Sequence, residues 1–195
     1  MGNAFSFLSA LLSRKCNCME VINDVSFKPP CPCTCRYISI NCHYSDVISS
    51  VAGRIVGHVY IREQAFRIPD SVYIFYLPIT SDISICCMHI KQPQNRYLSL
   101  PFLSCRGVII YSHANATDCG GMLPRCMQIS SRLSVDVLIY DYEGYGYSDG
   151  CHSEFSMCRD LEEVFKYALG IYTSDHIFLY GESSTQIDCS LTCSW

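Results

Sequence analysis

A serine whose surroundings suit nucleophilic chemistry lies near the end of the 195-residue sequence. The apolar residues 176–180 (HIFLY) are typical of a buried strand, and Gly-Glu-Ser-Ser at 181–184 follows at once. In a nucleophile elbow, G-x-S-x-G, small residues on both sides of the serine let a strand turn sharply and expose the hydroxyl. Ser183 fits the first half of this motif, whereas Thr185 replaces the second glycine. A plain turn at a strand end is the alternative interpretation.

A catalytic serine also needs partners. A histidine must take the hydroxyl proton, and a carboxylate must orient that histidine. After Ser183 the sequence holds one carboxylate, Asp188, and no histidine. His113 and His152 lie near the ends of predicted strands and are the alternative bases.

The elements that would position Ser183 begin with strands. Residues 71–79 and 82–90 predict an antiparallel hairpin, because both are rich in β-branched and aromatic residues and Thr-Ser separates them. Residues 107–113, 135–142 and 176–180 are short apolar runs, typical of strands that are covered on both faces.

Helices are predicted between these strands. Residues 122–133 predict one helix, with Pro124 in its first turn, and residues 153–172 predict a second with a regular apolar face. Alternating strands and helices at this spacing form right-handed crossovers and a parallel sheet. The predicted fold class is therefore α/β, with a mixed, mostly parallel sheet flanked by helices.

Three strand ends carry the residues of interest. They are SHANA at 112–116, DYEGYGYSDG at 141–150 and GESST at 181–185. Because ligands of open α/β sheets bind beyond the carboxyl ends of strands, we expect these stretches to meet at one edge.

The stretches 109–122 (IIYSHANATDCGGM), 131–150 (SRLSVDVLIYDYEGYGYSDG) and 177–184 (IFLYGESS) together resemble the α/β-hydrolase superfamily. More narrowly, they resemble the membrane-anchored α/β-hydrolase domain proteins that act as protein depalmitoylases. There the stretches read close to H-G-N-A-x-D, D-Y-x-G-Y-G-x-S-x-G and G-x-S-x-G. The resemblance covers about residues 83–184.

The resemblance implies roles for individual residues. Ser183 stands at the place of the nucleophile, and the backbone N–H groups of Asn115 and Ser184 would form the oxyanion hole. Ala114 replaces a family glycine, and its methyl group would restrict the backbone that aims the Asn115 N–H.

The loop at 141–150 has implied roles too. Gly144 and Gly146 would let it turn close to the site, Asp141 and Glu143 would support it, and the tyrosines at 142, 145 and 147 would pack. No cofactor and no metal is implied.

The family order, serine then acid then histidine, is not completed within this sequence. We therefore expect the chain to be the N-terminal part of an acyl-protein thioesterase-like hydrolase, incomplete at its C-terminal side and inactive as given. A non-catalytic, membrane-bound pseudohydrolase is the main alternative. A Cys-rich metal-binding module is another, based on Cys31, Cys33 and Cys35.

The N-terminus predicts lipid attachment. Met1-Gly2 with Ser6 fits the N-myristoylation pattern, and Cys16 and Cys18 are candidate palmitoylation sites. We thus expect residues 1–45 to be a Cys-rich anchor and linker, residues 46–195 a partial hydrolase domain, and the cytoplasmic face of membranes the location. A signal peptide and a plain buried helix end are the alternatives.

Composition narrows the remaining classes. The sequence is 49% hydrophobic and 16% charged, which is typical of a folded domain. A net charge of −4 gives no basic field for nucleic acid. Fifteen cysteines, an odd number, favour free thiols in a reducing compartment over a disulfide scaffold. The expected partners are the membrane surface and S-acylated protein substrates, and the sequence does not identify which substrates.

Overall fold

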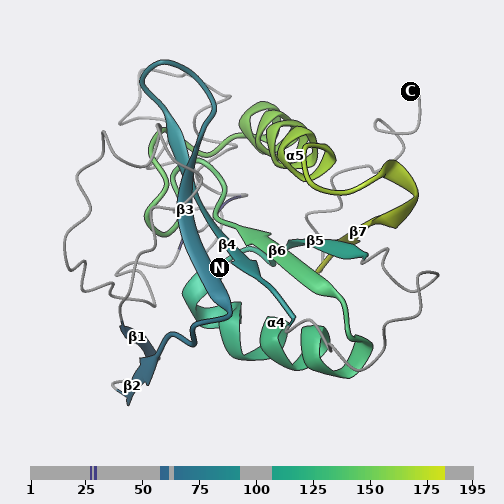
Figure 1. The fold of residues 1–195 in the computed structure, drawn as a ribbon. Coiled ribbons are helices and arrows are strands. Elements are labelled where there is room, and N and C mark those ends of the chain that lie inside the picture. The colour runs from purple at the N-terminus through teal and green to yellow at the C-terminus, as the bar shows by residue number, and fades with distance from the viewer. Residues whose placement is uncertain (1–26, 28, 30–57, 62–63, 93–106, 183–195) are drawn as a thin grey trace, which may run out of the picture.

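The computed structural model describes residues 27, 29, 58–61, 64–92 and 107–182. A small antiparallel pair, β1 (His58–Ile61) and β2 (Gln64–Arg67), precedes the main sheet. The main sheet contains β3 (Val72–Pro78), β4 (Ser84–Ile90), β5 (Val108–Ser112), β6 (Asp136–Tyr140) and β7 (Ile177–Gly181). Its strands follow the order β3-β4-β6-β5-β7 (Figure 1).

The five-stranded sheet is mixed. Strand β4 pairs antiparallel with both β3 and β6, whereas β5 pairs parallel with both β6 and β7. Four strands therefore run in one direction and β4 runs against them. This arrangement confirms the predicted α/β class and the predicted hairpin.

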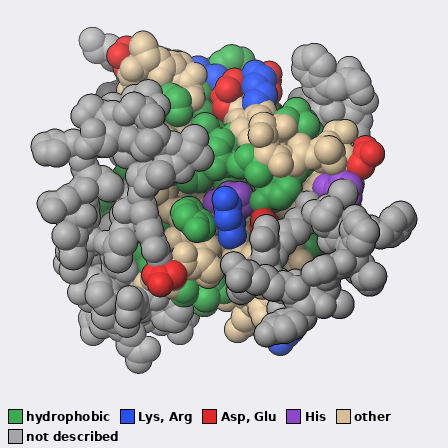
Figure 2. Space-filling model, in the orientation of Figure 1, with side chains coloured by type: hydrophobic (Ala, Val, Ile, Leu, Met, Phe, Trp, Pro, Cys, Tyr) green, Lys and Arg blue, Asp and Glu red, His purple; other side chains and the backbone are tan. Residues whose placement is uncertain are grey.

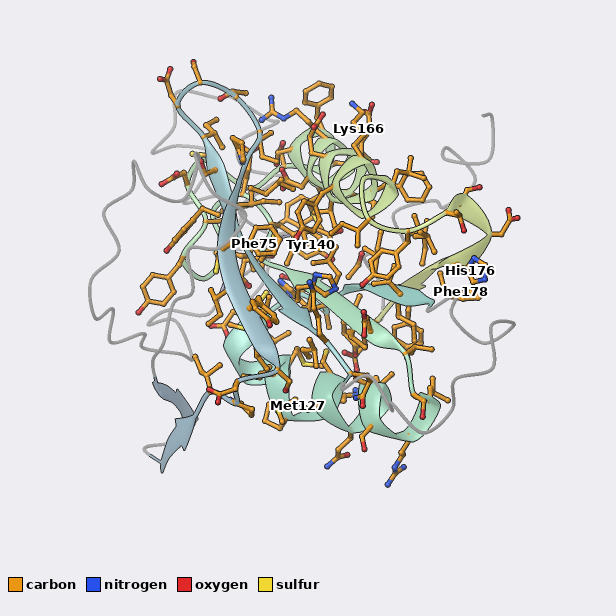
Figure 3. The ribbon with its side chains drawn as sticks, in the orientation of Figure 1. Phe75, Met127, Tyr140, Lys166, His176 and Phe178 are labelled. Atoms are coloured by element: carbon orange, nitrogen blue, oxygen red, sulfur yellow. The ribbon has the colours of Figure 1, made fainter. Side chains whose placement is uncertain are left out.

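One helix covers each face of the sheet, α4 (Cys119–Leu133) below it and α5 (Glu154–Leu169) above it in Figure 1. Side chains of the central strand β6 alternate between the two: Val137 and Ile139 join the cluster with α4, and Leu138 and Tyr140 join the cluster with α5. Every residue of β6 is buried, as expected of a strand covered on both faces. In Figure 3, Tyr140 and Phe75 lie on the α5 side and Met127 on the α4 side.

Helix α4 begins three residues earlier than predicted. The Asp118 side chain caps it by accepting a hydrogen bond from the Gly121 N–H at 2.9 Å, so the two glycines at 120 and 121 are helical and Pro124 lies beyond the first turn. Glycine has low helix propensity, but the cap and the burial of Cys119 and Gly120 outweigh that preference here.

Helix α5 agrees with its prediction apart from its ends. Ser153 and Ser156 form a reciprocal capping box at its start, and Gly170 follows its last residue. On its outer face, the Lys166 ammonium lies 2.8 Å from Glu162 and 2.9 Å from Glu163. Figure 2 shows acidic and basic side chains next to one another over this helix. A short 3-10 turn, η2 (Ser174–His176), leads into β7.

The structure describes only residues 27 and 29 of the first 57, and no residue after 182. The division expected at residue 45 and the incompleteness expected after Ser184 therefore lie outside the described residues. They stay predictions. Within the described part of the chain, no helix is both long and apolar enough to span a membrane.

Candidate active site

The carboxyl ends of β5, β6 and β7 lie side by side. Ser112, the last residue of β5, is in register with Tyr140 of β6 and with Gly181 of β7. The loops after these three strands therefore start next to one another, at the carboxyl ends of the strands, as we predicted from the sequence. Ser183 and Ser184 lie just beyond the last described residue, Glu182, and the candidate lipidation sites Gly2, Cys16 and Cys18 also lie outside the described residues.

Glu182, the residue before Ser183, is fixed from two elements. Its N–H donates to the Ser112 carbonyl at 3.0 Å, which continues the β5–β7 ladder. One carboxylate oxygen accepts a hydrogen bond from the Tyr111 hydroxyl at 2.7 Å, and the other pairs with the Arg125 guanidinium of α4. Burial and the Glu182 carboxylate raise the pKa of Tyr111, so this hydroxyl stays a donor.

The loop after β5, here called the Asn115 loop (residues 113–118), carries the candidate oxyanion donor. The Asn115 side-chain oxygen accepts a hydrogen bond from the Tyr145 hydroxyl at 2.7 Å. Among the described non-glycine residues, only Ala116 and Ser134 have a positive φ. The Ala114 backbone therefore avoids the left-handed region, and its methyl group causes no strain of that kind. The sharp turn in this loop is made by Ala116, at φ 69°. Whether the Ala114 methyl group affects the aim of the Asn115 N–H stays a prediction.

His113 lies in the protein interior. Its ring is fully buried against Tyr142 and Tyr145, with centroid distances of 4.6 and 5.6 Å. Its Nδ1 donates to the Ala114 carbonyl at 2.9 Å, because a carbonyl can only accept, and its Nε2 lies 3.4 Å from Asp141 Oδ1. His152 makes edge contacts with Tyr145 and with Phe27. Both alternative bases thus have packing roles.

The loop after β6, here called the Tyr145 loop (residues 141–150), supports the Asn115 loop through hydrogen bonds. The Tyr142 hydroxyl donates to the His113 carbonyl at 2.9 Å, and Asp141 Oδ1 accepts from the Cys119 N–H at 2.7 Å. Tyr142 and Tyr145 are buried, in agreement with their predicted packing role, and both also hold the Asn115 loop through their hydroxyls. Their spacing in the sequence gave no sign of these partners.

Glycines bring the Tyr145 loop close to its own carboxylates. Gly146 has φ +52°, and a Cβ built there would lie 2.1 Å from Asp141 Oδ2. Gly150 has φ +81°, and a Cβ there would lie 2.5 Å from Glu143 Oε2. Only glycine fits either position, for reasons of both space and backbone angle.

Metal binding finds no support in the described residues, where no three His, Cys, Asp or Glu side chains are grouped to hold an ion. The cysteines at 31, 33 and 35 lie outside those residues.

The strand order, the two covering helices and the three loops at one edge define the described residues as a mixed, mostly parallel α/β sheet with helices on both faces. No model of a known protein family matches the chain. Individual curated proteins do match parts of the chain. The α/β-hydrolase domain-containing protein 17C of Mus musculus is 30% identical over 117 residues, which is 58% of this chain and 33% of that protein. The 17B protein of Xenopus tropicalis is 25% identical over 181 residues, 83% of this chain and 59% of that protein.

Solved structures give similar but partial matches. Est1E from Butyrivibrio proteoclasticus, with bound ferulic acid, aligns with a TM-score of 0.46 and 19% identity over 56% of this chain and 42% of its own. An α/β serine hydrolase from Xanthomonas campestris aligns with a TM-score of 0.42 and 17% identity over 58% of this chain and 51% of its own.

These relatives confirm the resemblance to α/β-hydrolases and, more narrowly, to the α/β-hydrolase domain-containing 17 proteins. The chain spans about a third of the length of the 17C relatives that it matches.

Proposed function

We propose that this chain carries the nucleophile and the oxyanion hole of a serine acyl hydrolase that removes acyl groups from S-acylated proteins. The observation that carries the proposal is the position of Glu182. Its backbone is bonded to Ser112, and its side chain is held by Tyr111 and Arg125. Glu182 lies at the edge where the Asn115 loop begins, and Ser183 is the next residue in the sequence.

In the proposed reaction, Ser183 Oγ attacks the thioester carbonyl. The C–S bond breaks, the cysteine thiol of the substrate leaves with a proton, and the acyl group is carried on Ser183 until water hydrolyses the ester. The N–H groups of Asn115 and Ser184 would stabilise the negative charge on the carbonyl oxygen, and one such donor contributes roughly 3 kcal/mol. The Tyr145 hydroxyl would help to hold the Asn115 loop in place for this task.

The attack needs a base, and the 195 residues contain no histidine after Ser183. Because His113 is buried against Asp141, it is a poor candidate for that base. We therefore expect that a fluorophosphonate probe does not label the purified 195-residue chain. Strong labelling of Ser183 that disappears in Ser183→Ala would contradict this expectation and would assign a base within these residues.

We also propose that Gly2, Cys16 and Cys18 attach the chain to the cytoplasmic face of membranes. One myristoyl chain gives only marginal binding, so a palmitoylated cysteine would supply the second signal. In cells fed alkyne-tagged myristate, the tag should be incorporated and should be lost in Gly2→Ala. Cys16→Ser with Cys18→Ser should keep the tag but release the protein from membranes. A tag that survives in Gly2→Ala would overturn the myristoylation part.

A further inference from the structure

We infer that Glu143 and Asp160 share one buried proton, and that this proton holds the Tyr145 loop in place. The inference concerns the stability of the loop. Only its consequence for Asn115 rests on the proposed function.

The two carboxylates are enclosed together. Glu143 in the Tyr145 loop is 2% exposed, and Asp160 on α5 is fully buried. Asp160 Oδ2 accepts a hydrogen bond from the Glu143 N–H at 2.8 Å, so α5 holds the loop backbone through this carboxyl group. Gly150 closes one side, because its backbone leaves no room for even a methyl group beside Glu143 Oε2.

The charges around Asp160 do not balance when both carboxylates are ionised. Arg159 pairs with Glu143 and is the one cation among the groups that act on Asp160. Cys158 on α5, Tyr140 on β6 and Cys87 on β4 also interact with Asp160. Burial raises the pKa of all three, so they stay neutral and change the local charge in neither direction. One net negative charge would therefore remain buried, which is costly in a protein interior.

A proton on Asp160 removes this imbalance. As a carboxylate, Asp160 Oδ1 is buried and has no hydrogen-bond partner. As a carboxylic acid, Asp160 becomes a donor, and the Glu143 carboxylate beside it is the acceptor. Burial, followed by the neighbouring Glu143 charge, raises the pKa of Asp160 from 3.8 to about 7. The shared proton is thus present below neutral pH and is lost above it.

The loss of this proton should loosen the loop. When the loop opens, Asp160 gains water and returns to its ordinary pKa, so the closed loop binds one more proton than the open loop between pH 4 and 7. The closed state is therefore favoured most at low pH and loses this advantage as the pH rises through 7. Because Tyr142 and Tyr145 belong to the same loop, their bonds to His113 and Asn115 would weaken with it.

Two measurements on the 195-residue chain test the inference without any need for activity. The first is the infrared band of a protonated carboxyl group, recorded as a function of pH. A band that is present at pH 6 and lost by pH 8 is expected in the wild type and absent in Asp160→Asn. Asp175→Asn, a change at an exposed carboxylate in η2, is the matched control and should keep the band.

The second measurement is amide hydrogen exchange of Glu143, Gly144 and Tyr145, corrected for intrinsic rates. With a pKa of about 7, the opening equilibrium should rise about tenfold between pH 6 and pH 8. Asp160→Asn keeps an acceptor for the Glu143 N–H and a donor toward the Glu143 carboxylate. In this variant the opening equilibrium constant should therefore be about the same at pH 6 and at pH 8. Asp175→Asn should keep the tenfold rise.

Either of two results would overturn the inference: no titrating carboxyl band in the wild type, or loop exchange that does not change between pH 6 and 8. If Asp160→Asn fails to fold, Glu143→Gln serves in its place. It removes the neighbouring negative charge, so the pKa of Asp160 should fall and the band should titrate at lower pH than in the wild type. A band that titrates at the same pH as in the wild type would contradict the shared proton.

Discussion

The parallel strands of the main sheet begin at one side and end at the other, here called the amino edge and the carboxyl edge. Polar side chains are buried at both, but their hydrogen bonds are satisfied to different degrees. At the amino edge of β6, Asp136 accepts from the Gln92 N–H at 2.8 Å and from the Tyr172 hydroxyl at 2.6 Å. His89 Nε2 lies 2.8 Å from the same hydroxyl. Because that hydroxyl proton goes to Asp136, His89 must be the donor in this contact. Each of these buried groups has a partner.

At the carboxyl edge the pattern is the opposite. Four buried side-chain atoms in the described residues have no hydrogen-bond partner, and all four belong to the loops after β5 and β6 or to the first half of α5: His113 Nε2, Asp141 Oδ2, Arg159 Nε and Asp160 Oδ1. Natural proteins leave few such atoms, and those that remain are concentrated where function sets the arrangement. The comparison therefore indicates an amino edge built for stability and a carboxyl edge built for a site.

The largest expected effect that separates the edges comes from Gly146→Ala. A methyl group there would lie 2.1 Å from Asp141 Oδ2, in a backbone conformation with φ +52°. Overpacking and left-handed backbone strain together should lower the free energy of unfolding by about 4 kcal/mol. Urea denaturation measures the change.

Gly170→Ala is the matched control for that variant. Its φ is −69°, and the nearest atom that a Cβ would meet, the Tyr167 carbonyl oxygen, is 3.3 Å away. The expected change is below about 1 kcal/mol. If Gly146→Ala were as mild as Gly170→Ala, the tight approach of the loop to Asp141 would be wrong.

The elements of both edges could be predicted from the sequence because their signals are local. The apolar runs at 107–113 and 135–142 and the regular apolar face at 153–172 each depend on residues close together in the sequence. The start of α4 was predicted too late because Gly120 and Gly121 resemble a loop, and burial outweighed their propensity.

The contacts that support the site could not be predicted in the same way. Tyr145 bonds Asn115 thirty residues away, and Glu182 bonds Arg125 fifty-seven residues away. Such pairs depend on strand order and register, which one sequence does not encode locally. The same holds for the buried pair at 143 and 160, whose spacing fits an ordinary loop and helix just as well.

A smaller expected effect belongs to the amino edge and concerns pH. Burial is the main cause that lowers the pKa of His89 from 6.5 to about 4. The unfolded chain therefore binds more protons than the folded chain between pH 4 and 6.5, so the contribution of His89 to stability is complete above pH 6.5 and is lost as the pH falls. This direction is opposite to that expected for Asp160 at the carboxyl edge, so pH should separate the two networks.

His89→Gln isolates this effect, because Gln keeps a donor near the Tyr172 hydroxyl but cannot take up a proton. The difference in unfolding free energy between the wild type and His89→Gln should change by on the order of 3 kcal/mol between pH 6.5 and 4. Urea denaturation at several pH values measures it. A difference that stays constant would mean that His89 is hydrated or charged in the folded protein. The buried and fully hydrogen-bonded network that distinguishes the amino edge from the carboxyl edge would then be wrong.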